Sequence, residues 1–195
     1  MTHVHFRGLS FVVSTFALRW ILLAGLLSGS VFAEDASLVE LRKKAEAKAA
    51  AAFDDAWLSV LRNKAEKGDA AAFVELRKKA EAGDAVAQHN LGLLYKNGDY
   101  VLKDTAEAIK WFRKSAGQGN AYAQFNLGMY YANGDGVLKD SVQAAAWLNN
   151  AGANGDESAR SWLSEIEKTM TPDQKAEALK LAREIFEKIE AKKSK

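Results

Sequence analysis

The sequence predicts an all-α protein, a solenoid of helix–turn–helix repeats. Residues 80–115 and 116–151 align at a period of 36 residues, with 18 identical positions. Within each copy, apolar residues recur at the spacing of one face of an α-helix, and an Asn-Gly pair ends the first helix. A fixed period of this length is typical of stacked helical units that share a continuous core.

The first helix of each unit is predicted from an apolar face and a glycine stop. In the first copy the apolar residues at helical spacing are Ala87, Leu91, Leu94 and Tyr95. Gly98 follows them, and glycine readily adopts the left-handed conformation that ends helices. Another glycine, Gly92, lies inside the helix and recurs as Gly128. Because an internal glycine costs about 1 kcal/mol relative to alanine, its recurrence indicates close helix packing.

The second helix of each unit is predicted to begin at an aspartate. Asp104 is a favourable N-cap, and Glu107 three residues later predicts a capping box. The copy has Asp140 and Gln143 at the same places. The apolar face of this helix consists, in the two copies, of Ala108, Trp111, Phe112, Ala144, Trp147 and Leu148.

Related segments flank the two full copies. A partial third copy occupies residues 152–168, and the whole repeat region is predicted to span residues 68–168. Residues 34–67 are rich in Ala, Lys and Glu and are predicted to form N-terminal helices. At least three stacked units are usually needed for stability, so these flanking helices are expected to complete the stack.

A single helix is predicted to close the C-terminal end, within residues 169–195. Thr171 is a good N-cap, Pro172 suits the first helical position, and Gln174 completes a capping box. One face of this helix carries Ala178, Leu179, Ala182, Ile185, Phe186 and Ile189. Such a helix serves as the terminal cap that a solenoid needs to cover its last open face.

The first 33 residues have the pattern of a signal peptide. They carry Arg7 and Arg19 but no acidic residue, and the apolar run 20–27 follows. Val31 and Ala33 occupy the two positions that signal peptidase reads. The alternative is a retained membrane anchor, but a spanning helix needs about 20 apolar residues. We therefore expect cleavage near Ala33 and a periplasmic or secreted protein of a Gram-negative bacterium, without stable membrane insertion.

The segment after the predicted signal peptide is formally neutral. The chain has 27 basic and 25 acidic residues, and two of the basic residues lie in the first 33. This balance predicts neither nucleic acid nor an anionic membrane surface as a partner.

Few residues are available for catalysis or metal binding. The chain has no cysteine, and of its three histidines only His89 lies beyond the predicted signal peptide. His89 could be a ligand or a base, or simply a groove-facing or surface residue. The aspartates lie at predicted helix ends or turns, where capping explains them. We therefore predict no cofactor, no metal site and no enzymatic activity.

The repeated residues resemble a known family. The pattern is Ala-Gln-x-Asn-Leu-Gly-x-x-Tyr, then Asn-Gly-Asp, Val-Leu-Lys-Asp and Ala-x-x-Trp, at a period of 36 residues. It is similar to the Sel-one-like repeat (SLR), a relative of the tetratricopeptide repeat, most clearly over residues 80–151. The resemblance implies a right-handed α–α superhelix and a role in assembling protein complexes. Bacterial members of the family are often exported, and no particular partner is implied.

Positions that differ between the copies are the candidates for partner binding. In tetratricopeptide-like folds the first helices of the units line a concave groove. In the register of the two Leu-Gly pairs, the residues expected there are Val86, His89, Leu93, Lys96, Tyr122, Phe125 and Met129. Aromatic and methionine side chains are typical of interfaces, although these could instead pack against the neighbouring unit. Four repeated asparagines could contact a peptide backbone or serve in capping and helix–helix bonds: Asn90, Asn126, Asn97 and Asn133.

These observations predict an exported interaction protein that is not an enzyme. It would act as a scaffold or adaptor in the bacterial envelope and bind a peptide or protein in its groove. One alternative is a periplasmic regulatory subunit of a membrane sensor or secretion system. An alternative from another class is a cell-wall hydrolase, but no nucleophile–base pair or paired carboxylates stand out.

Overall fold

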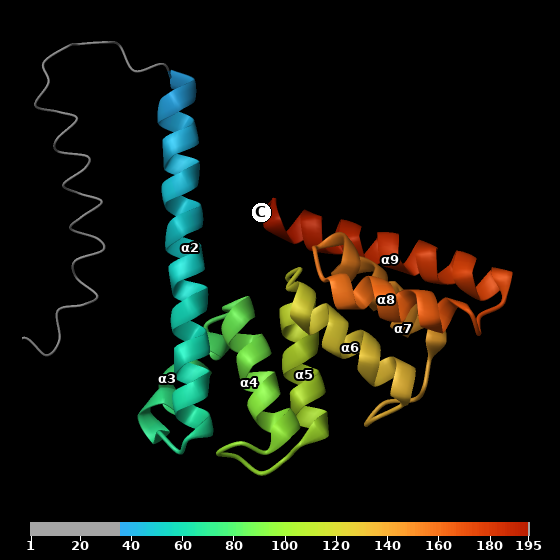
Figure 1. Cartoon of the computed structure of the whole chain (residues 1–195), viewed down its shortest axis with the longest axis horizontal. Helices are drawn as coiled ribbons and strands as arrows, with labels where there is room; N and C mark the ends of the chain where they lie inside the picture. Colours follow the sequence, from blue (N-terminus) through green and yellow to red (C-terminus); the bar gives the residue numbers. More distant parts are fainter. Residues whose placement is uncertain (1–35, 195) are drawn as a thin grey trace, which may run out of the picture. The chain divides into compact units, whose positions relative to one another are not determined.

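The computed structural model describes residues 36–194, and the chain divides into two units, residues 1–48 and 49–195. Every regular element in the described part is an α-helix, which confirms the all-α prediction (Figure 1). The helices are α2 (Ala36–Glu66), α3 (Ala70–Glu81), α4 (Ala85–Asn97), α5 (Thr105–Ala116), α6 (Ala121–Asn133), α7 (Ser141–Ala153), α8 (Glu157–Glu167) and α9 (Pro172–Lys193). The predicted signal peptide, residues 1–33, lies outside the described residues.

The described part of the first unit, residues 36–48, is the beginning of α2. Its side chains form ion pairs one helical turn apart, with Arg42 Nε 3.1 Å from Glu46 Oε1. Exposed pairs of this spacing stabilise a helix by a few tenths of a kcal/mol. The N-terminal helices predicted for residues 34–67 correspond to the single helix α2.

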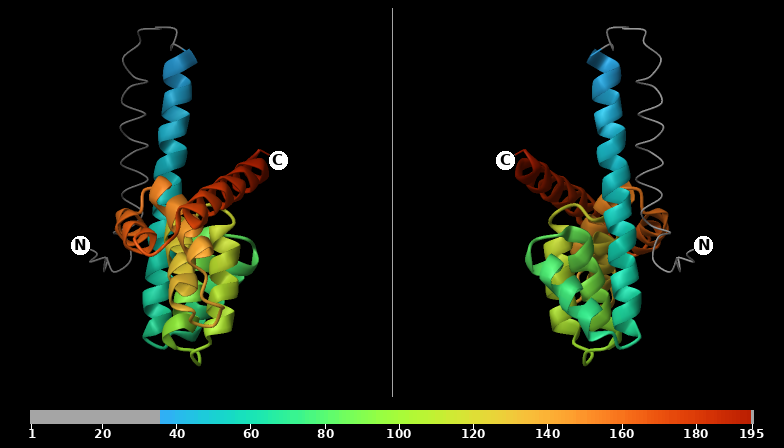
Figure 2. Two further views of the ribbon diagram at one scale, coloured as in Figure 1. Left: turned by 90° about the vertical axis from the view of Figure 1, so that its right-hand side faces the viewer. Right: turned by 90° about the vertical axis from the view of Figure 1, so that its left-hand side faces the viewer.

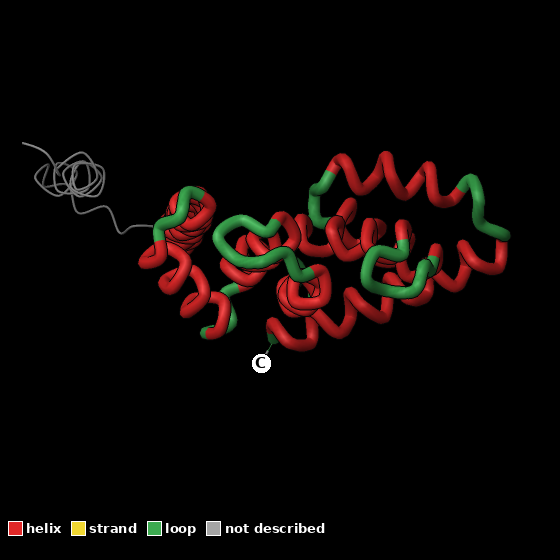
Figure 3. Tube along the Cα trace, turned by 90° about the horizontal axis from the view of Figure 1, so that it is seen from below, coloured by secondary structure: helices red, strands yellow, loops and turns green. Residues whose placement is uncertain are grey.

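In the second unit, α4–α5 and α6–α7 form two helix–turn–helix pairs (Figure 1). Each pair packs on its neighbours, α3 against α4, α5 against α6 and α7 against α8. Figure 3 shows that the described helices are joined by short loops. The longer loops follow α4 and α6, where Gly98 and Gly134 take the left-handed conformation with φ of 83° and 81°. The predicted glycine stops are therefore confirmed.

The predicted capping boxes at the second helices are only half formed. Asp104 accepts a hydrogen bond from the Glu107 N–H, as an N-cap should. Its own N–H, however, donates to the Tyr95 carbonyl at 2.9 Å, so the Glu107 carboxylate is not needed there and pairs with Lys110. Asp140 repeats this arrangement through Tyr131. The complete capping box of the described chain is at Thr171 and Gln174, as predicted.

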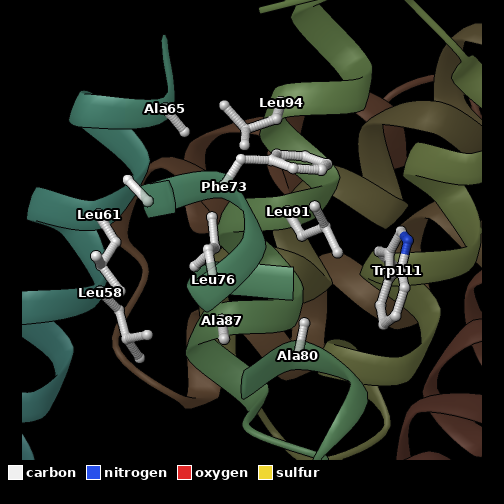
Figure 4. Close-up of a cluster of buried hydrophobic side chains, with 11 residues drawn as sticks. Leu58, Leu61, Ala65, Phe73, Leu76, Ala80, Ala87, Leu91, Leu94 and Trp111 are labelled. Atoms are coloured by element: carbon white, nitrogen blue, oxygen red, sulfur yellow. The ribbon is translucent and has the colours of Figure 1, made fainter. Parts of the chain in front are cut away.

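The core confirms why glycine recurs inside the first helices. A Cβ on Gly92 would lie 2.8 Å from the Phe112 ring, and one on Gly128 would lie 2.8 Å from Leu148 Cγ. Side chains of the second helix therefore occupy the space that a larger residue would need. Figure 4 shows the first core cluster, where buried leucines of α2, α3 and α4 meet beside Trp111.

Helix α9 packs on α7 and is inclined to the two helix pairs (Figure 2). Its buried face is narrower than predicted and consists of Ala178, Ala182, Ile185 and Ile189. Leu179 and Phe186, which the sequence placed on the same face, are instead 57% and 49% exposed. Ala182, Ile185 and Ile189 pack with Ala146 of α7, and the flanking Leu179 and Phe186 lie outside this contact.

A candidate interaction groove between α4 and α6

A groove of about 730 Å³ lies between the C-terminal end of α4 and the second half of α6. The loops that follow these two helices close it on one side. We call it the α4–α6 groove, and its lining residues are Lys96, Asn97, Lys103, Thr105, Asn126, Met129, Tyr130, Asn133, Asp135 and Gly136.

Local backbone geometry brings Lys103 back to the groove. Gly98 ends α4 in the left-handed conformation, and its α-carbon faces Lys103 so closely that a Cβ there would lie 3.1 Å from Lys103 Cβ. Any other residue at position 98 would meet both this contact and the strain of a positive φ. The Asn-Gly stop therefore positions a loop lysine beside the last turn of α4, which carries Lys96.

Asn126 is the centre of the hydrogen-bond network beside the groove. Its Oδ1 accepts from Lys96 Nζ at 3.2 Å, and its Nδ2 donates to the Tyr122 carbonyl at 2.9 Å. Because an ammonium group can only donate, the amide oxygen must face Lys96. The amide nitrogen then lies 3.3 Å from His89 Nε2, which is left as the acceptor.

His89 is a packed, neutral ring. Burial, followed by the positive charges of Arg62 and Lys96, lowers the pKa of His89 to about 4. The ring lies between two aromatic rings, with centroid distances of 5.8 Å to Phe112 and 5.9 Å to Tyr122. At neutral pH it therefore acts as a hydrogen-bond acceptor that links α4 to α6.

A similar pair of a cation and an amide occurs one unit earlier. Arg62 Nη1 on α2 approaches Asn90 Oδ1 at 3.5 Å, and Asn90 stands at the position of Asn126 in the first repeat. Glu66 Oε1 lies 3.0 Å from Arg62 Nε, but that contact lacks hydrogen-bond geometry. In both places a cation on one helix contacts the asparagine on the first helix of the following repeat, from α2 to α4 and from α4 to α6.

Three of the predicted groove residues are available to a partner near this site. Lys96 is exposed and Met129 is partly buried, and both line the α4–α6 groove. Tyr122 is 66% exposed and covers one side of the His89 ring.

The other predicted positions lie largely inside the stack. Val86 packs on the cluster that contains Leu91 and Trp111, and Leu93 packs on the cluster of α5 and α6. Phe125 packs against a cluster formed by Leu148 and Ala151 of its own helix pair and Ala159 of α8. For these three the structure shows the packing that was the alternative to groove exposure.

Sequence reasoning missed several groove residues. Lys103, Tyr130 and Thr105 line the groove but were not among the candidates. Lys103 did carry a signal, since its Val-Leu-Lys-Asp loop is identical in the two copies. That segment contributes to the sequence-based prediction only as part of the repeat pattern.

The described residues offer no cluster of three or more histidine or acidic side chains that could hold a metal ion. Within the same residues, no helix has both the length and the hydropathy of a membrane span.

Comparison with known proteins agrees with this arrangement. The family model of the Sel1 repeat matches residues 85–120 and 121–156, which begin at the first residues of α4 and α6. No curated protein matches the chain.

Two solved structures are similar to the chain. A Sel1 repeat protein from Oxalobacter formigenes is 36% identical, with 56% of this chain and 47% of that one covered and a TM-score of 0.50. A protective antigen present in uropathogenic Escherichia coli strains, displaying an SLR fold, is 28% identical. The match covers 91% of this chain and 46% of the antigen, with a TM-score of 0.59. The chain thus spans about half the length of each.

Proposed function

Because the chain is a helical repeat protein of the Sel1-like repeat family, we propose that it is an exported scaffold that binds a segment of a protein partner through the α4–α6 groove. Sel1 repeats generally mediate protein–protein interactions, and proteins built from them are generally non-catalytic. The proposal concerns the location of the protein, the surface it uses and the kind of partner it binds.

The observation that carries the proposal is the groove with its exposed rim. Tyr122 is 66% exposed although it is a large aromatic side chain, and Met129, seven residues later on α6, contributes an adaptable apolar surface to the groove lining. Aromatic residues and methionine are enriched at the centres of protein interfaces. Polar side chains surround them, which is the usual composition of a binding surface with a polar rim.

The observation that supports export is in the sequence. Residues 1–33 have the signal-peptide pattern described above. Expression of the full chain followed by N-terminal sequencing of the periplasmic fraction should give a protein that begins at Glu34. Recovery of only uncleaved chain in the membrane fraction would favour the anchor instead.

Partner binding is tested by a crosslinked pull-down from envelope extract. The bait is compared with a Tyr122→Glu, Met129→Glu variant, which places one charge in the groove and one on the exposed ring position of α6 near it. Neither substitution alters the packing of Phe125 against α7 and α8. A Val74→Glu variant is the control, since Val74 is 62% exposed on α3 and does not line the groove. Circular dichroism establishes that all three proteins are folded to the same extent.

We expect a partner that the parent and the Val74 variant capture and that the groove variant loses. Equal capture by all three would move the interface away from the α4–α6 groove. The identity of the captured protein then decides between a passive scaffold and a regulatory subunit of a sensor or secretion system.

A further inference from the structure

We infer that the α4–α6 groove recognises an acidic side chain in an extended segment of the partner, through Lys96 and Lys103. This inference rests on the proposed function and specifies the chemistry of the partner. Its evidence is the charge state of the lysines, the spare hydrogen bonds of the groove and the spacing of two asparagines.

The groove contains two lysines that are not neutralised by an acid. Lys96 donates to the neutral amide of Asn126, and Lys103 forms no ion pair or hydrogen bond with any described residue. The only carboxylate of the lining is Asp135, whose Oδ2 accepts a hydrogen bond from Asn133 Nδ2 at 3.4 Å. Burial and then the charge of Asp135 raise the pKa of Tyr130. The lining therefore keeps one net positive charge that a bound carboxylate would complement.

The pKa of His89 is consistent with a positive field on this side of α4, since burial lowers it first and the positive charges of Arg62 and Lys96 lower it further. Arg62 has a carboxylate partner in Glu66, whose Oε1 lies 3.0 Å from Arg62 Nε, whereas Lys96 donates to the neutral amide of Asn126.

Both lysines have unused N–H donors with which to bind a carboxylate. An ammonium group has three donors, and Lys96 uses one of them for Asn126. Charge-assisted bonds to carboxylate are stronger than bonds between neutral groups. The apolar surfaces of Met129 and Tyr130 line the same groove, where they can cover the methylene groups of a glutamate.

The spacing of two asparagines favours an internal acidic residue over a C-terminal carboxylate. Asn126 and Asn133 both line the groove from α6, and seven residues of helix rise about 10 Å. An extended peptide covers that length with about three residues. Asn126 and Asn133 could each bond to the backbone of a bound peptide, one on either side of its acidic residue. This arrangement suits a peptide whose chain continues in both directions past that residue.

The test is an NMR titration of the isotope-labelled protein at low salt and neutral pH with three small probes. The first is the doubly blocked peptide N-acetyl-Ala-Glu-Ala-amide, and the second replaces its Glu by Gln. The third is N-acetyl-Ala-Ala-Ala with a free carboxyl terminus. We expect the Glu peptide to shift the amides of Asn126, Met129 and Asn133, and to bind about five- to tenfold more tightly than the Gln peptide.

The chain offers a matched control for the lysines. Lys139 stands at the position of Lys103 in the second repeat but does not line the groove. Lys103→Met should weaken Glu-peptide binding about two- to fivefold, and Lys139→Met should leave it unchanged. Lys96→Met should act like Lys103→Met, and the second repeat shows that the helix accepts a neutral residue there, Ala132.

Several results would overturn the inference. Equal affinity for the Glu and Gln peptides would remove the role of charge, and equal losses at Lys103 and Lys139 would remove the site. Stronger binding of the free-carboxylate probe would exclude the side-chain assignment. Absence of any shift at tens of millimolar Glu peptide would show that the groove does not select acids. A groove-dependent pull-down would survive each of these results, so failure of the inference is distinguishable from failure of the proposed function.

Discussion

The two repeats have the same helices but differ in the contact between the first helix of each unit and the first helix of the next, which we call the seam. Where α4 meets α6, His89 lies between Phe112 and Tyr122, and Asn126 receives a hydrogen bond from Lys96. One repeat later, the residue at the position of His89 is Phe125, which packs against Leu148, Ala151 and Ala159.

Substitutions at equivalent positions, His89 by Phe125 and Lys96 by Ala132, therefore separate a polar seam from an apolar one. The polar seam is the one beside the groove, and the apolar seam joins the second repeat to α8. Conserving the helix-building residues while varying the seam allows a repeat protein to place a binding surface at one joint and a rigid contact at the next.

The largest expected effect contrasts Phe125 with Tyr122, which lie one turn apart on α6. Phe125→Ala should lower the free energy of unfolding by about 3 kcal/mol, because it removes a ring that fills the seam with the next unit. Tyr122→Ala should change it by less than about 0.5 kcal/mol, since its ring is mostly exposed. Urea unfolding of both variants at neutral pH measures the difference. Equal losses would mean that the two seams do not differ in packing.

The second prediction concerns the pH dependence that His89 introduces. Its pKa of about 4 lies below the unfolded value of 6.5, so the unfolded chain binds the proton more tightly. The stability that this neutral ring contributes is fully present above the unfolded value and is lost as the pH falls toward 4. Between pH 7 and pH 5 the loss from this group should be about 2 kcal/mol.

The His89→Phe variant copies the second seam into the first and should lack that loss. Urea unfolding of the parent and the variant at pH 7 and pH 5 gives the comparison. Other groups titrate equally in both proteins, so their contribution cancels. Parallel pH profiles would show that His89 is not buried in the neutral form.

The third prediction compares the equivalent glycines. Gly128→Ala should destabilise the protein by about 1–2 kcal/mol, because its Cβ would meet Leu148 at 2.8 Å and the backbone oxygen of Ala144 at 3.2 Å. Gly92→Ala should cost less, since the Phe112 ring is its close contact and a ring can tilt. Thermal unfolding monitored by circular dichroism ranks the two. The opposite order would mean that the Leu148 seam can relax more readily than the Phe112 ring.

Gly152→Ala is the matched control for this series. It is also a helical glycine, but its nearest contact is the side chain of the exposed residue Arg160. The higher helix propensity of alanine should offset the adjustment of that side chain, leaving the stability within about 0.5 kcal/mol of the parent. A large loss here would point to the Arg160 hydrogen bonds with the Gly152 carbonyl.

The smallest expected effect is at the loop leucines that the repeats share. Leu102 and Leu138 are 92% and 90% exposed, so Leu102→Lys and Leu138→Lys should each change the unfolding free energy by less than about 0.5 kcal/mol. A larger loss in denaturant titration would show that the loops pack more tightly than their exposure indicates.

Local signals made the fold predictable. The glycine stops, the aspartate N-caps and the final capping box act over four residues or fewer, so they can be read without tertiary knowledge. The capping boxes at Asp104 and Asp140 failed for a reason outside that range. Their N–H groups bond to Tyr95 and Tyr131, nine residues earlier, across a loop whose path was not predicted.

The candidate site was predictable only in part. Repeat register placed Lys96 and Met129 among the candidates for partner binding, and both line the α4–α6 groove. Register alone placed both Tyr122 and Phe125 in the groove. It could not show that Tyr122 is exposed while Phe125 packs against the core. Lys103 was missed because it reaches the groove from a loop rather than from the helix face.

By itself the sequence determined the all-α class, the 36-residue unit, the helix ends and the packing role of Gly92 and Gly128, because each depends on short-range geometry or on repetition. Only the tertiary structure decided which side chains lie in a seam and which remain accessible. That choice depends on the surrounding helices, since an apolar cluster of α7 and α8 packs against Phe125 while Asn126 and Lys96 keep the adjacent joint polar. Burial depends on residues distant in sequence, and a repeat pattern describes each unit without its neighbours.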